Sequence, residues 1–306
     1  MSSITPPEPP GISQNAAGFA LLGVAVLCYG GLWPVIRAAG PYIPPFWFGT
    51  LRVFIGAIIL FAVLAASGQL RVPTRRDLPA VLSVGIFMLG IYVVLMHYAL
   101  QFVPAGRGAL LAYSTPIWVV PAAALFLGER LTNLRLAGLV CGLLGLGVLF
   151  NPMGFDWSDP SVLLGNGLCL LAAFSWSIAI LHMRGHTWNL SPLQLAPWQL
   201  LVAATVGLPF SLLLEPRTHI EFGWPLVLLV LYGGVLGTAL AMWSTVSAIR
   251  RIGAVTCSVG LLGGPVIATA ISVMFLGEPL TLTLASGLVL ILSGIAMVSL
   301  AQAWDR

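Results

Sequence analysis

Apolar residues run along this chain in long stretches, interrupted only by short groups of charged residues, proline and glycine. An apolar stretch of about 18 residues or more is typical of a helix that spans a membrane. The interruptions predict ten such helices, near residues 17–37, 44–67, 77–101, 105–127, 134–150, 160–182, 192–214, 222–248, 253–276 and 283–303. The fifth is short for a bilayer, so we expect it to be peripheral or to thin the bilayer nearby.

The composition agrees with a protein of the bilayer. Hydrophobic residues make up 59% of the chain and charged residues 7%, and the mean hydropathy is +1.02. A soluble protein needs charge over its exterior, so this composition excludes that class. The start of the chain has no basic stretch ahead of an apolar run, unlike a cleaved signal peptide. Its four prolines predict a disordered tail over residues 1–16.

Arginine predicts the orientation, because the chain contains no lysine. With the N-terminus inside, nine of the 13 arginines fall in inner loops or the C-terminal tail and three at outer ends, while Arg52 lies within a span. Basic residues gather on the cytoplasmic side of membrane proteins, so both termini are predicted to be cytoplasmic. The net charge of +4 then reflects topology, and nothing else supports binding to nucleic acid.

Two nearly identical heptapeptides indicate an internal duplication. FLGERLT occupies residues 126–132 and FLGEPLT occupies residues 275–281, so the second copy begins 149 positions after the first. The flanking residues align at the same spacing without gaps, and Pro116 matches Pro265. Self-similarity of this kind is the signature of a repeated structural unit.

The duplication predicts the fold. After the tail, one unit covers residues 17–151 and the second covers residues 152–306, each with five predicted helices. Because five is odd, the second unit enters the membrane from the opposite side. We therefore predict an all-α integral membrane protein of ten transmembrane helices, built as two inverted five-helix repeats around a central cavity. Many transporters use this arrangement to open alternately to each face.

Three segments carry a resemblance to a known family. PPFWFGTLRVFIGAIIL, residues 44–60, resembles the second helix of the EamA-type ten-helix exporters of the drug/metabolite transporter superfamily. STPIWVVPAAALFLGERLT and its repeat resemble the fourth and ninth helices of that family. The resemblance implies export of a small solute. The aromatic residues and the lack of buried carboxylates look most like the YddG-type exporters of aromatic amino acids. One departure is Tyr29-Gly30-Gly31 with Trp33, where the family often has Trp-Gly.

The paired prolines mark a candidate substrate site. Proline within a helix removes one hydrogen bond, so we expect the carbonyls of Ala112 and Leu261, four residues before Pro116 and Pro265, to lack a normal partner. Irregular backbone at membrane depth is tolerated beside protein or a wet cavity, and matched interruptions indicate a transporter's site. The alternatives are bends that serve packing, or hinges for gating.

Aromatic and polar side chains supply candidate lining for that site. Tryptophans near helix ends typically form an interfacial belt. Several others lie deeper, where a ring-lined pocket would suit a flat amphipathic solute, although packing or lipid contact explains each one alone equally well. The candidates are Trp33, Tyr92, Met96, Tyr113, Trp176, Trp198, Trp243 and Ser244.

Ionisable residues within a span are candidates for function. Arg52 lies about 12 Å into its helix, and His97 and Arg107 lie near the same outer side. They are candidates for binding a substrate carboxylate or closing an outer gate. The alternatives are that Arg52 caps carbonyls of neighbouring helices and that His97 reaches water.

The acidic residues all fall in tails, loops or helix ends, so no carboxylate is placed to bind a driving ion. We expect uncoupled facilitated diffusion, or coupling through His97 alone. The repeated Glu129 and Glu278 are interpreted as structural, accepting N–H groups at a positive helix end. Gly138 and Gly142 predict a close helix contact, within the protein or at a dimer seam.

The predicted function is therefore transport of amino acids, with aromatic and other apolar ones favoured, or of similar metabolites. An exporter of hydrophobic cations, a channel and an intramembrane enzyme are the alternatives, although no catalytic motif is present. The four cysteines show neither zinc nor disulfide spacing, and no metal or cofactor is expected. We expect the protein in a bacterial inner membrane, with a small-molecule substrate as its partner, as a monomer or alternatively a homodimer.

Overall fold

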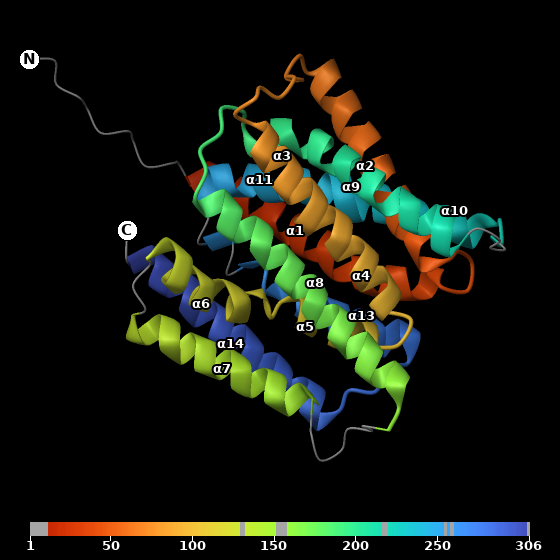
Figure 1. The fold of residues 1–306 in the computed structure, drawn as a ribbon, viewed down its shortest axis with the longest axis vertical. Helices are drawn as coiled ribbons and strands as arrows, with labels where there is room; N and C mark the ends of the chain where they lie inside the picture. The colour runs from red at the N-terminus through yellow and green to blue at the C-terminus, as the bar shows by residue number, and fades with distance from the viewer. Residues whose placement is uncertain are drawn as a thin grey trace, which may run out of the picture.

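The computed structural model describes residues 12–128, 132–150, 158–215, 220–253, 256–257 and 260–304, and within them the regular structure is helical (Figure 1). The elements of the first half are α1 (Ile12–Ala39), α2 (Pro45–Ala66), α3 (Leu78–Ser83), η1 (Val84–Ile91), α4 (Tyr92–Ala99), α5 (Ala105–Ala112), α6 (Thr115–Leu127) and α7 (Asn133–Phe150). Those of the second half are α8 (Pro160–Arg184), α9 (Pro192–Leu214), α10 (Trp224–Leu231), η2 (Tyr232–Leu240), α11 (Ala241–Ile252), α13 (Gly263–Leu276) and α14 (Leu282–Trp304).

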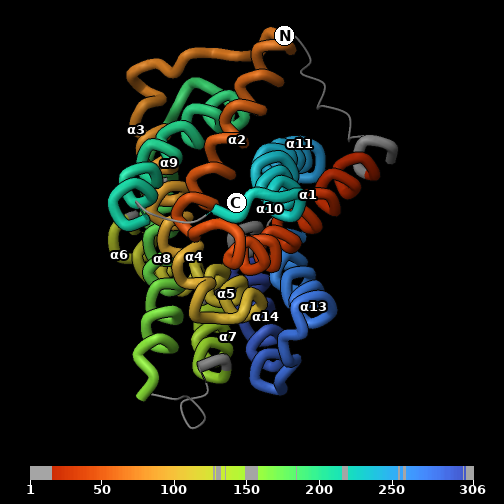
Figure 2. The backbone as a smooth tube through the Cα atoms, turned by 90° about the vertical axis from the view of Figure 1, so that its right-hand side faces the viewer, coloured from red at the N-terminus to blue at the C-terminus, as the bar shows by residue number. Residues whose placement is uncertain are grey.

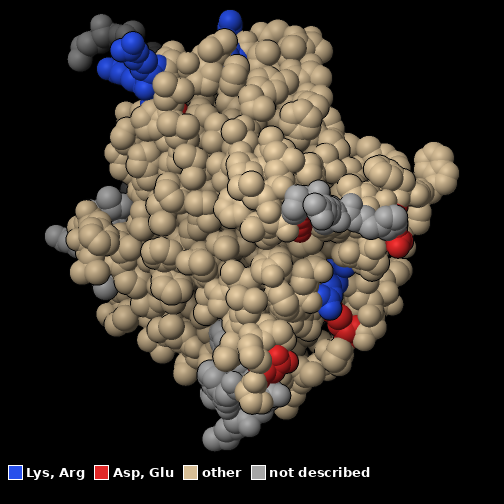
Figure 3. All heavy atoms as spheres, turned by 45° about the vertical axis from the view of Figure 1, so that its right-hand side comes forward, with Lys and Arg blue, Asp and Glu red and all other residues tan. Residues whose placement is uncertain are grey.

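Seven helical segments of the described chain are long and apolar enough to cross a membrane. They are Ala16–Ala39, Pro45–Ala66, Leu78–Ala99, Ala105–Phe126, Pro160–Met183, Pro192–Leu214 and Trp224–Ile252. Three further apolar helices are shorter, at Leu136–Val148, Gly263–Leu276 and Leu282–Val298. The face of the molecule in Figure 3 agrees, because uncharged residues cover nearly all of it. The prediction of an all-α membrane protein is confirmed at this level.

Helices distant in the sequence pack side by side. In the upper part of Figure 1, α2 packs along α9 and α1 packs along α11, and the view in Figure 2 agrees. In the lower part, α7 packs along α14, while α8 packs on α4 between the two groups. Helix α13 of the second half packs on α1 and α5 of the first half. These pairings bring the two halves of the chain together.

Glycines allow α7 and α14 to touch. A Cβ atom on Gly294 would lie 2.6 Å from the carbonyl oxygen of Gly138 and 2.7 Å from the backbone nitrogen of Gly142. Further along α7, a Cβ atom on Gly145 would lie 2.8 Å from the backbone nitrogen of Ile291. Contacts move backward along α14 as they move forward along α7, so the two helices are antiparallel. The predicted close contact at Gly138 and Gly142 is confirmed, and it lies within the protein.

Two spans contain π-helical stretches that the sequence analysis did not predict. Helices α3, η1 and α4 form one continuous span, and α10, η2 and α11 form another. A π-helix closes its hydrogen bonds over five residues instead of four, which widens the turn, and such stretches are frequent at functional sites. η1 packs on α9 and η2 packs on α2. Each π-helix therefore faces a helix of the other half of the chain.

The two paired prolines coincide with helix breaks. α5 ends at Ala112, and α6 begins after a turn with Pro116 as its second residue. α13 begins after a turn at residues 261–262, and Pro265 is its third residue. The predicted interruption at each proline is thus confirmed.

As expected, both carbonyls lack the normal donor four residues on, but neither is left without a partner. The Ala112 carbonyl accepts a hydrogen bond from the Thr115 hydroxyl at 3.0 Å. The Leu261 carbonyl accepts one from the backbone N–H of Gly264 at 2.9 Å. A side chain or a tighter turn replaces the donor that proline lacks, because a buried carbonyl left without a partner is costly.

Candidate substrate site

An aromatic cluster lies among α1, α4, α8 and the turn between α5 and α6. The rings of Tyr92 on α4 and Trp176 on α8 meet edge to face, with centroids 4.7 Å apart. Tyr113, in the turn between α5 and α6, interacts electrostatically with Tyr92 and with Tyr29 of α1. The Tyr29 hydroxyl is hydrogen-bonded to Thr245 of α11. The four rings thus come from α1, α4, α8 and the turn between α5 and α6, and α11 adds a hydroxyl group.

These rings lie deep in the protein without being fully covered by other side chains. Protein atoms surround Tyr29, Tyr92 and Tyr113 on all sides, yet each keeps part of its surface accessible, as does Trp176. A side chain that lies deep in a protein and is still partly accessible borders a space that other side chains do not fill. Rings with an accessible face and a hydroxyl group suit a flat amphipathic solute.

Arg52 lies beside this cluster in a buried polar network. Only 7% of its surface is accessible. Its Nε donates to Nε2 of His97 at 3.0 Å, and its Nη1 donates to the Thr238 hydroxyl of η2 at 2.9 Å. Thr238 in turn donates to the Gly233 carbonyl at 2.7 Å, five residues earlier. The wide turn of the π-helix thereby holds the hydroxyl that accepts from Arg52.

The hydrogen bonds of His97 determine its tautomer. Nδ1 lies 2.7 Å from the carbonyl oxygen of Val93, which can only accept, so Nδ1 carries the proton. Nε2 is then the acceptor for Arg52, and the imidazole in this arrangement is neutral. Because His97 is 1% exposed, the alternative that it simply reaches water is wrong. It positions the Arg52 guanidinium.

No carboxylate in the described part of the chain lies close to Arg52. The side chains that interact with it electrostatically are those of Tyr92 and Tyr29. The described acidic residues lie at helix ends or in loops, namely Asp77, Asp159, Glu215, Glu221 and Glu278. Moving a cation from water into a protein interior costs several kcal/mol unless it is paired and hydrogen-bonded. Arg52 has hydrogen bonds but lacks a countercharge among these residues.

Two of these carboxylates cap helices from a distance. The Glu278 carboxylate accepts the backbone N–H groups of Ala105 and Gly106 at the start of α5, at 2.8 and 3.3 Å. The Glu215 carboxylate accepts those of Phe46 and Trp47 at the start of α2, at 3.3 and 3.2 Å. The structural interpretation of Glu278 is confirmed, whereas Glu129 lies outside the described residues.

Burial and hydrogen bonding act in opposite directions on the carboxyl groups at helix ends. Burial raises the pKa of Glu215, although the N–H groups of Phe46 and Trp47 lower it in part. Burial also acts to raise the pKa of Asp77, but hydrogen bonds outweigh it and lower that pKa to about 2. Asp77 has no accessible surface, yet it lies at the rim where few protein atoms surround it, so hydrogen bonding prevails.

The structure brings some of the predicted site residues together. Arg52, His97, Tyr92, Tyr113 and Trp176 form the group described above. Trp33 and Met96, 8% and 1% exposed, lie in the adjoining hydrophobic core. Pro116 borders a narrow space between the α5–α6 break and helices α7 and α14. Pro265 is buried and Leu261 is partly buried beside it.

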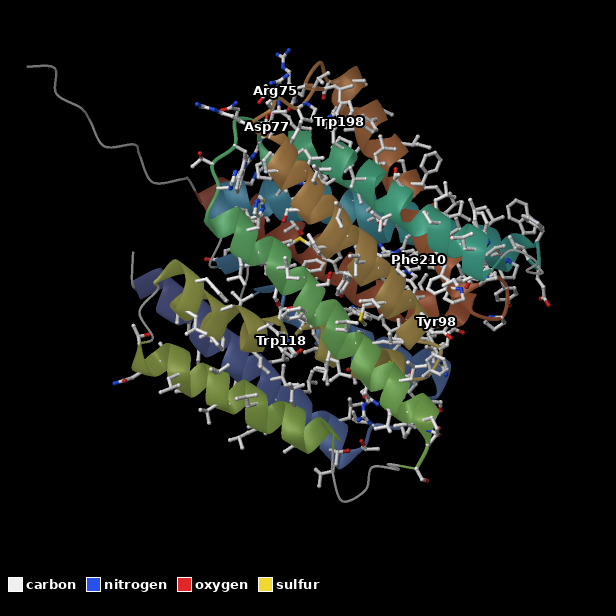
Figure 4. All side chains as sticks on the ribbon, in the orientation of Figure 1. Arg75, Asp77, Tyr98, Trp118, Trp198 and Phe210 are labelled. Carbon is white, nitrogen blue, oxygen red and sulfur yellow. The ribbon has the colours of Figure 1, made fainter. Side chains whose placement is uncertain are left out.

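The structure separates other predicted residues from that group. Trp198 donates from Nε1 to the Arg71 carbonyl at 3.0 Å and lies at the same end of the molecule as Asp77 (Figure 4). Trp243 is 38% exposed on α11, and its neighbour Ser244 is fully buried. Arg107 is on α5 and lies near Cys169 of α8. The grouping of Trp198 and Trp243 with the deep aromatic residues is therefore wrong.

The predicted central cavity is not open in the described part of the structure. The space beside Pro116 has a volume of about 10 Å³, on the order of what one water molecule needs. A second space, between α2, η1, α4 and α9, is narrower still. Large side chains such as Trp33 and Met96 fill the centre. Neither space has room for an amino acid.

Thr238 and Gln199 were missed by the sequence analysis. Thr238 accepts from Arg52, and Gln199 is 5% exposed on α9. Each is a polar residue in an otherwise apolar span, which is a usable signal, because such residues typically face the protein interior. The same signal had singled out Arg52.

Comparisons with known proteins show what kind of protein carries this site. A model of the EamA-like transporter family matches residues 16–151 and again residues 163–300. The uncharacterized transporter YoaV of Bacillus subtilis is 29% identical over 90% of this chain and 95% of its own. The pseudopaline exporter CntI of Pseudomonas aeruginosa is 26% identical over 92% of this chain and 95% of its own.

A solved crystal structure is also similar to this chain. It shares 25% sequence identity and a TM-score of 0.62, covering 96% of this chain and 99% of that one. The two matched regions of the family model together include all the residues of the candidate site. The chain belongs to the EamA-like transporter family.

Proposed function

We propose that the protein exports small amphipathic metabolites from a bacterial cell by alternating access, with aromatic and other apolar amino acids favoured. In this proposal ten helices cross the inner membrane as two inverted five-helix repeats, both termini are cytoplasmic, and the monomer is the working unit. Transport runs down the substrate gradient without an ion, or is coupled to protons through His97.

Matched features of the two halves support the inverted repeat. The π-helices begin at Val84 and Tyr232, and the breaks precede Pro116 and Pro265. Glycine-rich α7 and α14, which end the two halves, pack antiparallel, as equivalent helices of inverted repeats would. Paired interruptions at corresponding positions typically surround a transporter's substrate site.

The observation that carries the proposal is the set of deep but partly accessible rings at Tyr29, Tyr92, Tyr113 and Trp176. An alternating-access carrier passes through closed states, and the narrow spaces of this conformation agree with such a state. A hydrophobic cation fits the same rings less well, because Arg52 would repel it at close range.

Reconstituted transport tests this function. Purified protein in proteoliposomes is assayed with the twenty amino acids, several hydrophobic cations and pseudopaline, the solute named for one relative. We expect saturable flux of aromatic amino acids above that of protein-free vesicles. Trp176→Ala should reduce that flux severalfold, whereas Trp243→Ala, which changes an exposed ring of the same type, should leave it near the wild-type value.

The same vesicles test coupling. Concentrative uptake driven by a sodium gradient would contradict the proposed mechanism, as would proton-driven uptake that persists in His97→Gln. Equal flux of all probes, without saturation, would indicate a channel instead of a carrier.

A further inference from the structure

We infer that the transported solute carries a carboxylate and that the Arg52 guanidinium binds it, so that the substrate supplies the countercharge that the described protein lacks. This inference rests on the proposed function and names its substrate class. The solute would be an aromatic or apolar molecule with one anionic end, the anion against Arg52 and the apolar part against Tyr92 and Trp176.

The free edge of the guanidinium is the first argument. Nε and Nη1 of Arg52 donate to His97 and Thr238, both neutral acceptors. Nη2 donates to no acceptor in the described part of the chain. Arg52 nevertheless keeps accessible surface, and the partly accessible Tyr29 and Tyr92 lie beside it. Guanidinium N–H groups bind carboxylates through charge-assisted hydrogen bonds, which are stronger than bonds to neutral acceptors.

The positioning of Arg52 is the second argument. His97 is held by Val93 in the tautomer that accepts from Nε, and Thr238 is held by Gly233 with its lone pair toward Nη1. His97 and Thr238 thus hold the Arg52 guanidinium in one orientation before a ligand binds. Such preorganisation lowers the entropy cost of binding. Tyr29 and Tyr92 are the tyrosines that lie near Arg52.

A purely structural role explains the arrangement less well. In a structural role Arg52 would cap backbone carbonyls, but it donates to the side chains of His97 and Thr238 instead. The equivalent contact in the other half of the molecule packs without a charge. There, Gly85 of η1 approaches the Gln199 carbonyl of α9, just as Gly234 of η2 approaches the Arg52 carbonyl of α2. Packing at this contact therefore does not require an arginine.

Probes that differ in one group test the inference on wild-type protein. Competition against the flux of a transported aromatic amino acid is measured with phenylalanine, phenylalaninamide, 3-phenylpropionate and 3-phenylpropanamide in proteoliposomes. Replacing a carboxylate by a carboxamide keeps the shape and removes the charge. We expect each carboxylate to compete about 10- to 100-fold better than its amide, the range of a hydrogen-bonded charge.

Substitutions locate the effect. In Arg52→Gln the preference for the carboxylate should fall to about twofold or less, and Arg52→Lys should restore part of it. The matched control is Arg75→Gln, the same substitution at an exposed loop residue, at the end of the molecule where Asp77 and Trp198 lie (Figure 4). Size-exclusion profile and melting temperature in detergent establish that each variant is folded. If Arg52→Gln does not fold, Tyr92→Phe, which removes one hydroxyl, should still reduce the preference severalfold.

The outcomes separate this inference from the function on which it rests. Transport of amides or cations as fast as carboxylates by wild-type protein would overturn the carboxylate inference and leave the transporter standing. A carboxylate preference that persists in folded Arg52→Gln would overturn the role of Arg52. Transport of none of the probes in either assay would overturn the proposed function itself, and the inference with it.

Discussion

The two π-helices make the same contact with different chemistry. On one side, a Cβ atom on Gly234 of η2 would lie 2.6 Å from Ile55 and 3.3 Å from the Arg52 carbonyl oxygen of α2. On the other side, a Cβ atom on Gly85 of η1 would lie 2.7 Å from Val202 and 2.9 Å from the Gln199 carbonyl oxygen of α9. The backbone geometry is shared, while one contact holds a buried cation and the other a neutral amide.

The hydroxyl differs in the same way. In η2, Thr238 bonds to the carbonyl of Gly233, five residues before it. In η1, at the register that pairs Gly85 with Gly234, the residue that matches Thr238 is Leu89, which has no hydroxyl group. Both wide turns exist, but only the one in η2 supports an arginine. The comparison indicates that the backbone contact serves packing, so the charge of Arg52 is open to the ligand-binding role proposed above.

The largest expected loss of stability comes from substitutions at Gly85 and Gly234, which test whether the two contacts are equally well packed. Gly85→Ala and Gly234→Ala each place a methyl group against backbone and branched side chains, which must shift to admit it. We expect each variant to lose about 1–3 kcal/mol of stability, the usual cost of overpacking. Gly23→Ala is the control, because a Cβ atom on Gly23 would meet nothing within 4 Å. Stability is measured as the melting temperature in detergent. A decrease for only one of the two variants would show that the contacts of Gly85 and Gly234 are not equivalent in packing.

The second effect tests what the hydroxyl does on the charged side. Thr238→Val keeps the shape but leaves Nη1 of Arg52 and the Gly233 carbonyl without this partner. We expect a loss of about 1–2 kcal/mol in stability and a severalfold weaker preference for carboxylate solutes. Thr205→Val on α9 is the control, since that hydroxyl bonds only to its own helix. An unchanged carboxylate preference in Thr238→Val would show that Arg52 is positioned without η2.

Sequence reasoning reached the breaks but not the π-helices. Pro116 and Pro265 announce an interruption because proline removes a donor at a known position. A π-helix has no comparable residue signal, since Gly85 and Gly234 allow close approach without requiring a wider turn. The hydrogen bonds of Arg52 to His97 and Thr238 were not predicted either, because they depend on how three helices rotate against one another.

The aromatic residues show a related limit. Tyr92 and Trp176 meet in the interior, while Trp243 is exposed and Trp198 binds the Arg71 carbonyl at one end. Tyr92, Trp176 and Trp198 lie in helices with apolar residues on every side, so hydrophobic periodicity does not distinguish their inner faces. Neither the depth of Trp198 along its helix nor the direction of Trp243 around its helix followed from the sequence pattern.

A third, smaller effect concerns how α2 is held against α9. Glu215, at the end of α9, accepts two N–H groups at the start of α2. Glu215→Gln keeps the size but removes the charge at that positive helix end, so we expect a loss of about 1 kcal/mol in stability. The measurement is chemical or thermal unfolding near pH 7. A gain in stability would show that the cost of burying this carboxylate outweighs its hydrogen bonds.

The smallest expected effect on stability concerns Asp77, at the start of the span that contains η1. The Asp77 carboxylate, just before α3, accepts from the Thr74 hydroxyl at 2.7 Å and from the backbone N–H of Asn189 at 2.7 Å. It thereby ties the beginning of the η1 span to the loop that precedes α9. The effect is small because Asp77 lies at the rim, where solvent screens the interaction.

Because the pKa of Asp77 is lowered, the stability that its hydrogen bonds contribute depends on pH in a known direction. Its pKa is about 2 in the folded protein against an ordinary 3.8, so its contribution to stability is complete above about pH 4. As the pH falls from 3.8 toward 2, the unfolded chain takes up a proton first, and that contribution is lost. Wild-type protein should therefore lose more stability over this interval than Asp77→Asn, which has no group to titrate. Equal acid sensitivity of the two proteins would mean that the charge of Asp77 does not hold η1 and α9 together, and the neutral contact would then depend on packing alone.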